Sequence, residues 1–270
     1  MSELLKINNL DVKFDTDEGR ITAVENVSIS VKQGEVLGIV GESGSGKSVT
    51  AKAIMQLNPG NTIYNEDAEI IIDGENVIKF TSKEDLKKIR GGKVSMIFQE
   101  PMASFAPAIK IGDQMVEQLL LHKNIKKEEA KSISLDMLTR VGITDTEKRF
   151  NQYAFELSGG MRQRAMIAMA LSTMPKLLLA DEPTTALDVT IQAQVLKLMK
   201  DIIKEYKMGV IFITHDLGVI AQTADQIAVM YLGCVVEKGS VNEILKNPKH
   251  PYTKGLIAAL PDVNNLEAPL

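Results

Sequence analysis

Apolar and polar residues alternate along the chain with two different periods, which predict strands and helices in turn. Val27, Ile29 and Val31 are apolar at every second position, as on one face of a half-buried strand. Four short apolar runs have the length of buried strands: 35–40, 93–98, 176–181 and 209–214. Helical patterns separate several of these runs, so we expect an α/β fold with a mainly parallel sheet.

Turn and cap signals mark the ends of some elements. The helical pattern over 47–57 is predicted to stop at Asn58, Pro59 and Gly60. Residues 68–80 have the pattern of a hairpin, with Asp73 and Gly74 at or near its turn. Thr81 and Glu84 have the spacing of a capping box, which predicts the start of a short helix.

Between about residues 111 and 156 the strand signals fade and helical spacing takes over. One helix is predicted from apolar residues at helical intervals, namely Ala130, Ile133, Met137, Leu138 and Val141. Gly142 is placed to end that helix. We therefore predict a helical insertion within the α/β core.

Composition narrows the class of protein. The chain has 270 residues, 44% of them hydrophobic, and a formal net charge of −4. A core of ordinary size is possible, and the basic excess typical of nucleic-acid-binding proteins is missing. The N-terminus has no apolar run like that of a signal peptide, and the weakly polar stretch 165–180 is too short to span a bilayer. The single cysteine, Cys234, is expected to be a buried structural thiol.

A glycine-rich segment between a predicted strand and a predicted helix matches the pattern GxxxxGK[ST]. Backbone N–H groups of such a loop converge on phosphate oxygens, and the following helix adds its positive dipole end. We expect Lys47 to reach the outer phosphates and Ser48 to bind Mg²⁺. The candidate nucleotide-binding residues are Gly41, Glu42, Ser43, Gly44, Ser45, Gly46, Lys47, Ser48 and Val49. The motif alone indicates an NTP-binding protein and does not separate kinase, GTPase and transporter.

Polar residues at the ends of other predicted strands are candidates for hydrolysis. Asp181 can hold Mg²⁺, and Glu182 can orient or deprotonate a water molecule. His215 follows the run 209–214 and could contact the γ-phosphate. Gln99 follows 93–98 and could contact Mg²⁺ or the attacking water.

A second glycine-rich turn leads into a helical pattern at residues 157–161. Its residues are Leu157, Ser158, Gly159, Gly160 and Met161. A helix N-terminus preceded by such a turn can bind an anion. The chain therefore has two predicted anion sites of this kind.

Together these motifs resemble the ABC transporter ATPase family. In family order, 41–48 resembles the Walker A loop, Gln99 the Q-loop, 157–161 the signature, 177–182 the Walker B strand and His215 the switch histidine. The D-loop is represented by Ala186, Leu187 and Asp188. The resemblance implies a P-loop NTPase core with an N-terminal antiparallel β subdomain and an inserted helical subdomain. It also implies ATP and Mg²⁺ as ligands.

In that family, the signature loop of one subunit completes the nucleotide site of another. The resemblance implies a head-to-tail dimer in which Ser158, Gly159 and Gly160 contact the partner's ATP. Phe14 is the candidate to stack on adenine, with a core phenylalanine as the alternative. The second ATPase subunit is either another copy of this chain or a sister protein.

Segments at 98–102, 156–164, 236–240 and 250–261 are similar to the branch of oligopeptide, dipeptide and nickel importers. That branch implies two transmembrane permease subunits, an extracytoplasmic substrate-binding protein and a peripheral location on the cytoplasmic face of the membrane. It implies one ATPase domain over residues 1–270, with a helical subdomain at about 105–160 and a tail at about 240–270.

Other readings remain open at this point. The same branch could carry nickel or a metal chelate instead of oligopeptides or dipeptides. Exporter ATPases share the catalytic motifs, so only the features at 98–102 and 250–261 separate them from this chain. A soluble ABC ATPase of DNA repair or translation usually adds coiled coils or basic arms. The signature turn argues against a P-loop kinase, because a phosphate-acceptor site does not need that element.

Overall fold

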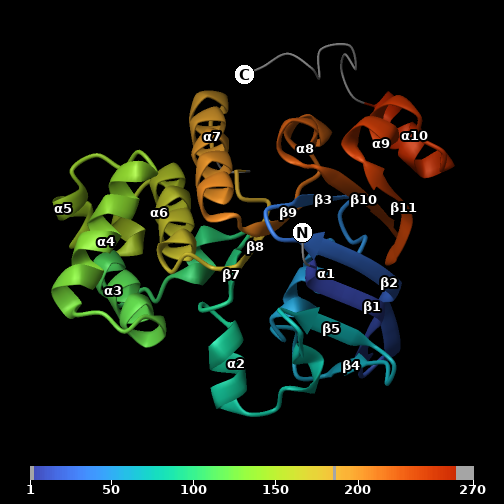
Figure 1. Cartoon of the computed structure of the whole chain (residues 1–270), viewed down its shortest axis with the longest axis horizontal. Helices are drawn as coiled ribbons and strands as arrows, with labels where there is room; N and C mark the ends of the chain where they lie inside the picture. Colours follow the sequence, from blue (N-terminus) through green and yellow to red (C-terminus); the bar gives the residue numbers. More distant parts are fainter. Residues whose placement is uncertain (1–2, 185–186, 260–270) are drawn as a thin grey trace. The chain divides into compact units, whose positions relative to one another are not determined.

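The computed structural model describes residues 3–184 and 187–259 (Figure 1). The chain forms two compact units. The first unit consists of Met1–Leu86 and Lys207–Leu270, and the second of Lys87–Tyr206. No helix in the described ranges combines the length and the apolar character that a membrane span requires.

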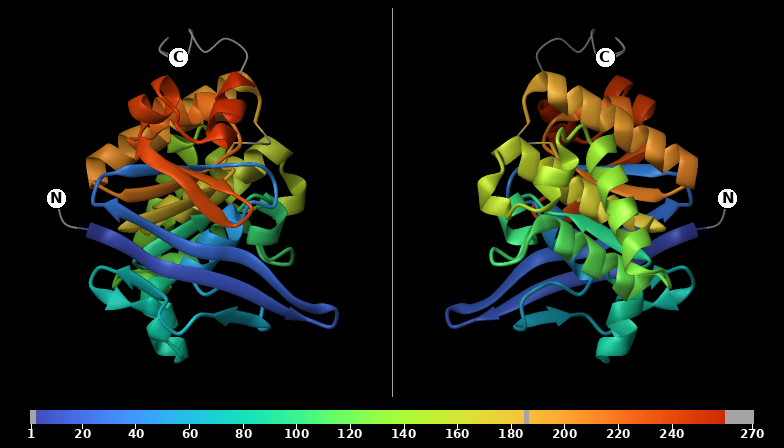
Figure 2. Two further views of the ribbon diagram at one scale, coloured as in Figure 1. Left: turned by 90° about the vertical axis from the view of Figure 1, so that its right-hand side faces the viewer. Right: turned by 90° about the vertical axis from the view of Figure 1, so that its left-hand side faces the viewer.

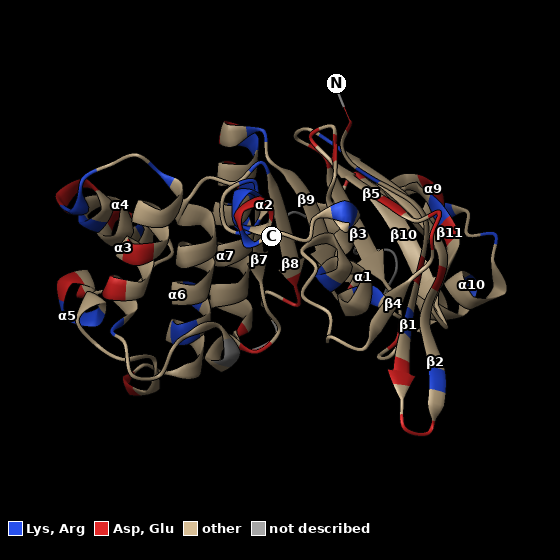
Figure 3. Ribbon diagram, turned by 90° about the horizontal axis from the view of Figure 1, so that it is seen from below, with Lys and Arg blue, Asp and Glu red and all other residues tan. Residues whose placement is uncertain are grey.

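The first unit begins with an antiparallel sheet in the order β2-β1-β5-β6, with β4 also paired to β1. Its strands are β1 Glu3–Thr16, β2 Gly19–Lys32, β4 Thr62–Tyr64, β5 Glu69–Ile72 and β6 Glu75–Asn76. Strands β1 and β2 form a long hairpin (Figure 2). The tip of the hairpin is rich in acidic residues (Figure 3). Near the tip, Asp15 Oδ1 lies 3.9 Å from Arg20 Nε. The predicted antiparallel β subdomain is confirmed.

A second set of strands in this unit is mainly parallel. Its order is β11-β10-β3-β9, with β10, β3 and β9 parallel and β11 antiparallel to β10. The strands are β3 Val36–Val40, β9 Gly209–Ile213, β10 Gln226–Tyr231 and β11 Cys234–Ser240. Every residue of β3 and β9 is buried, as their continuous apolar runs predict.

The helices of the first unit are short. They are α1 Lys47–Ile54, the 3₁₀ turn η1 Val77–Lys79, α8 Leu217–Thr223, α9 Val241–Lys246 and α10 Pro251–Ala258. Helix α2, Lys83–Ile89, runs from the first unit into the second.

The second unit contains the parallel pair β7 Val94–Ile97 and β8 Leu177–Asp181, together with a group of helices. The helical segments are η2 Pro101–Ser104, α3 Ile111–His122, α4 Lys127–Arg140, α5 Thr146–Phe150, η3 Ala154–Glu156, α6 Gly159–Ser172 and α7 Val189–Tyr206. Helices α3, α4 and α6 pack on one another through apolar faces. The helical insertion is confirmed, while the bounds of a single domain with a helical subdomain at 105–160 stay a prediction.

One predicted hairpin turn and one predicted helix end are confirmed. Asp73 and Gly74 both have positive φ angles, 52° and 84°, and join the paired residues Ile72 and Glu75. This is the backbone geometry of a two-residue hairpin turn. Helix α4 ends before Gly142, whose φ is 77°.

Three local predictions were wrong. Helix α1 ends at Ile54 and not at residue 57, because Gln56 turns left-handed (φ 51°) and Leu57 N–H donates to Lys52 O. This bond closes the helix end in the manner of a Schellman motif. The cap of α2 is Ser82, one residue after the predicted Thr81, with its hydroxyl accepting from Asp85 N–H.

The third concerns Cys234, which was expected to be buried. It is half-buried in β11, an edge strand paired only with β10 among the described strands. Its Sγ lies 4.0 Å from Glu25 Oε2. Burial, together with the nearby acidic groups of Glu25 and Asp11, raises the pKa of the thiol. The raised pKa favours the protonated thiol, which is the less nucleophilic form of cysteine.

Candidate nucleotide-binding and hydrolysis site

The phosphate loop links the end of β3 to the start of α1 in the first unit. Two of its glycines are required by the backbone around them. A Cβ on Gly41 (φ 155°) would lie 2.1 Å from Met230 O, and one on Gly46 (φ 96°) would lie 2.7 Å from Ala23 O. Neither position has room for a side chain. The loop therefore sits tightly between β10 and β2.

The side chain of Lys47 lies across this loop. It is 7% exposed, and its Nζ donates to Gly41 O at 2.8 Å and to Glu42 O at 2.7 Å. A third contact joins Nζ to the Ser45 hydroxyl at 3.4 Å. The ammonium group is thus held at the loop by neutral oxygens, which phosphate oxygens can replace with stronger charge-assisted bonds.

The remaining candidates of this loop continue into the first turn of α1. Ser48 and Val49 are half-buried there, while Glu42, Ser43 and Gly44 are exposed. No acidic residue lies in the first turn of α1, so the positive end of the helix dipole is not offset.

Phe14 is half-buried in β1 of the same unit. It lies two residues beyond Val12, and Val12 pairs with Val24 of β2. The Val24 side chain in turn lies 3.2 Å from the Cβ position of Gly46. Phe14 itself pairs with Ile21 and Thr62, and it is not a fully buried core residue.

His215 follows β9 at the same sheet edge as the phosphate loop. Ile39 of β3 is paired in parallel register with Ile213 of β9, so Gly41 and His215 each lie two residues beyond a matched pair. His215 is exposed. The next residue, Asp216, caps α8 by accepting from the N–H groups of Gly218 and Val219. The cap fixes the backbone directly after the histidine.

In the second unit, the structure brings together the polar residues that follow β7 and β8. Ile97 pairs with Ala180, and Gln99 and Glu182 each lie two residues beyond that pair. Gln99 Nε2 donates to Glu182 Oε2 at 3.2 Å. Asp181 is 3% exposed. An amide and a carboxylate joined in this way can both act on one water molecule.

Glu182 has an unusual backbone conformation. Its φ is 48°, in the left-handed region that side chains other than glycine seldom adopt. Gln163 of α6, which is fully buried, holds the following turn by donating to Pro183 O and, at 3.5 Å, to Glu182 O. Sequence reasoning missed this role. The available signal was a glutamine on the buried face of α6, most of whose other residues are apolar.

The signature turn begins α6. Ser158 is the N-cap, and its hydroxyl accepts from Met161 N–H at 3.3 Å. Leu157 is buried beneath the turn, and Arg162 Nη1 donates to Leu157 O at 3.1 Å. The helix N-terminus favours an anion at this turn, since an arginine and no acidic residue lie in the first turn of α6.

The two glycines of this turn differ in exposure, and Gly160 is half-buried. Ser158 and Gly159 are exposed, and a Cβ on Gly159 would meet no described atom within 4 Å. A Cβ placed on Gly160 would lie 3.5 Å from the side chain of Leu187. These two residues, one from the signature turn and one from the predicted D-loop, are therefore neighbours within this unit. Asp188 caps α7 by accepting from Ile191 N–H at 3.0 Å. Ala186 of the predicted D-loop lies outside the described residues.

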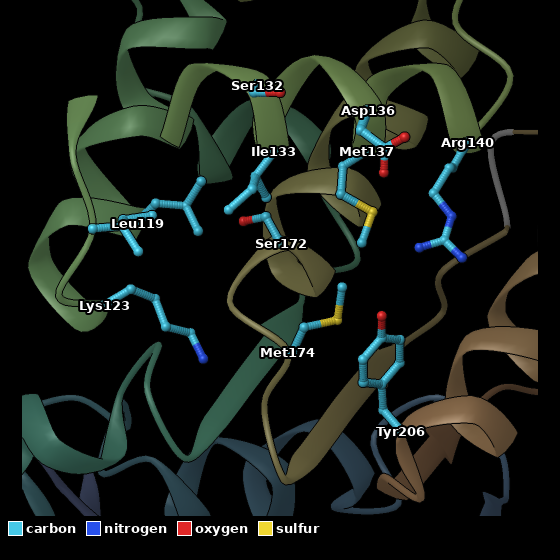
Figure 4. A pocket seen from close by; sticks show the side chains of 11 residues that line it. Leu119, Lys123, Ser132, Ile133, Asp136, Met137, Arg140, Ser172, Met174 and Tyr206 are labelled. Carbon is cyan, nitrogen blue, oxygen red and sulfur yellow. The ribbon is translucent and has the colours of Figure 1, made fainter. Parts of the chain in front are cut away.

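A hollow of about 570 Å³ in the second unit is separate from these residues (Figure 4). Its lining comes from α3, α4, the end of α6 and Tyr206, with Lys123 and Arg140 beside apolar side chains such as Met137. None of Gln99, Asp181, Glu182 or residues 157–161 lines it. The hollow is therefore no part of the candidate hydrolysis site.

Comparison with known proteins agrees with this chemistry. The ABC transporter family pattern matches residues 24–185, and that of the oligopeptide/dipeptide transporter C-terminal region matches residues 236–269. The oligopeptide transport ATP-binding protein OppD of Bacillus subtilis is 51% identical over 98% of this chain and 74% of its own length. The dipeptide transport ATP-binding protein DppD of Lactococcus lactis is 48% identical over 97% and 75%.

A solved structure with the same fold is a dimeric ATP-binding cassette in a post-hydrolysis state with ADP and phosphate bound. It has a TM-score of 0.79 and 28% identity, and the match covers 88% of this chain and 98% of that one. The chain therefore belongs to the ABC transporter family as an ATP-binding, ATP-hydrolysing subunit. Within the family it groups with the ATP-binding proteins whose C-terminal region is that of oligopeptide and dipeptide transporters.

Proposed function

We propose that this subunit powers the import of oligopeptides or dipeptides. The observation that carries the proposal is the similarity of nearly the whole chain, including residues 236–269, to ATP-binding proteins named for peptide transport. The ATPase motifs alone would fit an exporter equally well. The relatives are named for oligopeptide and dipeptide transport, which favours peptides over nickel as cargo.

In this proposal, residues 41–49 bind the triphosphate and Phe14 stacks on the adenine ring. Lys47 moves from its carbonyl partners to the outer phosphates. Mg²⁺ would be held by Ser48, Gln99 and Asp181, because each can offer a side-chain oxygen, the donor that Mg²⁺ prefers. When bound, Mg²⁺ neutralises charge on the phosphates.

Glu182 acts as the general base. Its carboxylate orients the attacking water and takes its proton. Gln99 positions this carboxylate through the hydrogen bond from Nε2 to Glu182 Oε2. His215 contacts the γ-phosphate and completes the catalytic set. The left-handed backbone of Glu182 and the bonds from Gln163 support this role, because strained conformations of this kind cluster at active sites.

The signature turn serves the nucleotide of a second ATPase subunit. Ser158, Gly159 and Gly160 offer an exposed, positively polarised helix N-terminus. Leu157 and Met161 frame that turn, and the D-loop residues Leu187 and Asp188 lie next to it. Two subunits arranged head to tail would each supply the turn that the other needs.

The importer also contains two transmembrane permease subunits and an extracytoplasmic binding protein that selects the peptide. This subunit binds the permeases from the cytoplasmic face of the membrane. Closure of the ATPase pair around ATP opens the permeases outward, and hydrolysis resets them.

The first test is Glu182→Gln, which keeps the shape of the side chain and removes the base. We expect MgATP binding to persist while turnover falls by about 10²- to 10⁴-fold. Light scattering should show a dimer of the variant in MgATP and a monomer without nucleotide. The double variant Ser158→Arg/Glu182→Gln is the control and should stay monomeric. A monomeric Glu182→Gln protein at saturating MgATP would count against the proposal.

A further inference from the structure

The C-terminal helix α10 reaches the phosphate loop through one side chain of the same unit. The Tyr252 hydroxyl accepts a hydrogen bond from Glu42 N–H at 3.0 Å, across 210 positions of sequence. Tyr252 is half-buried, and its ring packs on that of Tyr231 with the centroids 4.3 Å apart. The hydroxyl is therefore held at the loop by packing as well as by its hydrogen bond.

The residues around Tyr252 give α10 a defined start. His250 is the N-cap, its Nδ1 accepts from Tyr252 N–H at 3.2 Å, and Pro251 occupies the first helical position. The Glu237 carboxylate of β11 accepts from Lys249 N–H at 2.8 Å and from His250 N–H at 2.9 Å. These contacts tie β11 to the start of α10 and so help to position Tyr252 at the loop.

The effect on the loop concerns the peptide unit between Gly41 and Glu42. Its N–H donates to Tyr252, and its carbonyl accepts from Lys47 Nζ at 2.8 Å. When Lys47 turns to a phosphate, the carbonyl loses that partner. The bond to Tyr252 remains and keeps the peptide unit in place.

We propose that Tyr252 is a positioning residue for nucleotide binding, through which the C-terminal segment holds the phosphate loop in its binding conformation. The proposal rests on the assignment of residues 41–48 as the phosphate site. Burial raises the pKa of the Tyr252 hydroxyl, so the contact is made by the neutral group at physiological pH. A loop held in advance loses less conformational freedom when ATP binds.

The test compares two hydroxyl deletions in the full chain. Tyr252→Phe keeps the ring stack and removes the acceptor of Glu42 N–H. Tyr231→Phe removes a hydroxyl from the other ring of the same stack. Calorimetric Kd values for MgATP and steady-state KM and kcat for ATP hydrolysis are measured for both. We expect Tyr252→Phe to raise Kd and KM by about two- to tenfold, the effect of one neutral hydrogen bond, with kcat unchanged.

Tyr231→Phe should match the wild type in all three constants. An unchanged Kd and KM in Tyr252→Phe would overturn the inference, and so would an equal change in Tyr231→Phe. The melting temperature without nucleotide is the folding control. A Kd increase that merely accompanies a large drop in that temperature would also overturn it, since loss of fold would then be the cause.

Lys47→Ala separates this inference from the proposed function. If Lys47→Ala weakens MgATP binding at least about tenfold while Tyr252→Phe is silent, the phosphate site stands and only the inference fails. If neither variant changes Kd, the phosphate site is wrongly assigned and both fail.

Discussion

The phosphate loop and the signature turn look alike in sequence, but they differ in how closely the residues of their own unit pack against them. Each is a glycine-rich turn that leads into a helix, α1 in one case and α6 in the other. Gly41 and Gly46 press against neighbouring backbone, and Lys47 is buried across the loop. Gly159 is exposed, and no described atom would touch a Cβ placed there.

The difference shows which glycines the fold needs. The phosphate loop needs its glycines because Met230 and Ala23 leave no room for a side chain. The signature turn has room for one within its own unit, so folding does not account for Gly159. A ligand that approaches from another molecule does account for it, which is why the comparison supports a shared nucleotide site.

The largest expected effect comes from filling the open turn. Ser158→Arg places a long side chain at the exposed N-cap. We expect ATPase activity to fall by about 10²-fold or more, because the contacts to the transition state are lost. MgATP binding to the isolated subunit, measured by calorimetry, should stay near the wild-type value. Loss of that binding would mean that the turn serves the nucleotide of its own subunit.

Removing the buried cation tests the other region. Lys47→Ala should weaken MgATP binding by about 1.5–3 kcal/mol, or roughly 10- to 150-fold, through loss of a charge-assisted contact. Lys52, a basic residue in the last turn of α1, provides the control, because Lys52→Ala removes equal charge away from the loop. An unchanged Kd in Lys47→Ala would remove this residue from the site.

The smallest expected effect is on the free energy of unfolding, where glycine-to-alanine substitutions should act differently in the two turns. Gly41→Ala should destabilise the fold by about 1–3 kcal/mol, because φ is 155° and the new methyl group meets Met230 O. Gly159→Ala should leave stability unchanged or raise it by up to about 1 kcal/mol, since alanine favours the helix. Denaturant unfolding measures both.

ATPase activity completes this comparison. Gly159→Ala should still lose activity, by about tenfold if one charge-assisted contact to the partner's nucleotide is lost. A stable and fully active Gly159→Ala protein would show that nothing approaches that face during turnover.

Much of the fold could be predicted from sequence because its signals are local. The runs that became β3 and β9 are continuously apolar, β8 is apolar up to Asp181, and every residue of the three strands is buried. The motif residues were identifiable because they follow directly after these strands. The end of α1 was missed because Gln56 adopts a left-handed conformation that its residue type does not favour.

The contacts that support the site were out of reach for a different reason. Gln163 bonds to the turn after β8, and Tyr252 bonds to Glu42, over separations of about 20 and 210 positions. Neither side chain has a spacing that marks its partner. Only tertiary structure brings such pairs together, so their roles follow from coordinates and not from periodicity.

The shared site is tested most directly by mixing two variants, each defective in a different part of that site. A Lys47→Ala copy retains a sound signature turn, and a Ser158→Arg copy retains a sound phosphate loop. In a mixed head-to-tail pair, one of the two sites has both intact parts. The account predicts that an equimolar mixture regains up to about a quarter of the wild-type ATPase rate, since half of the pairs are mixed and each has one working site. A mixture no more active than its two components would contradict the shared site.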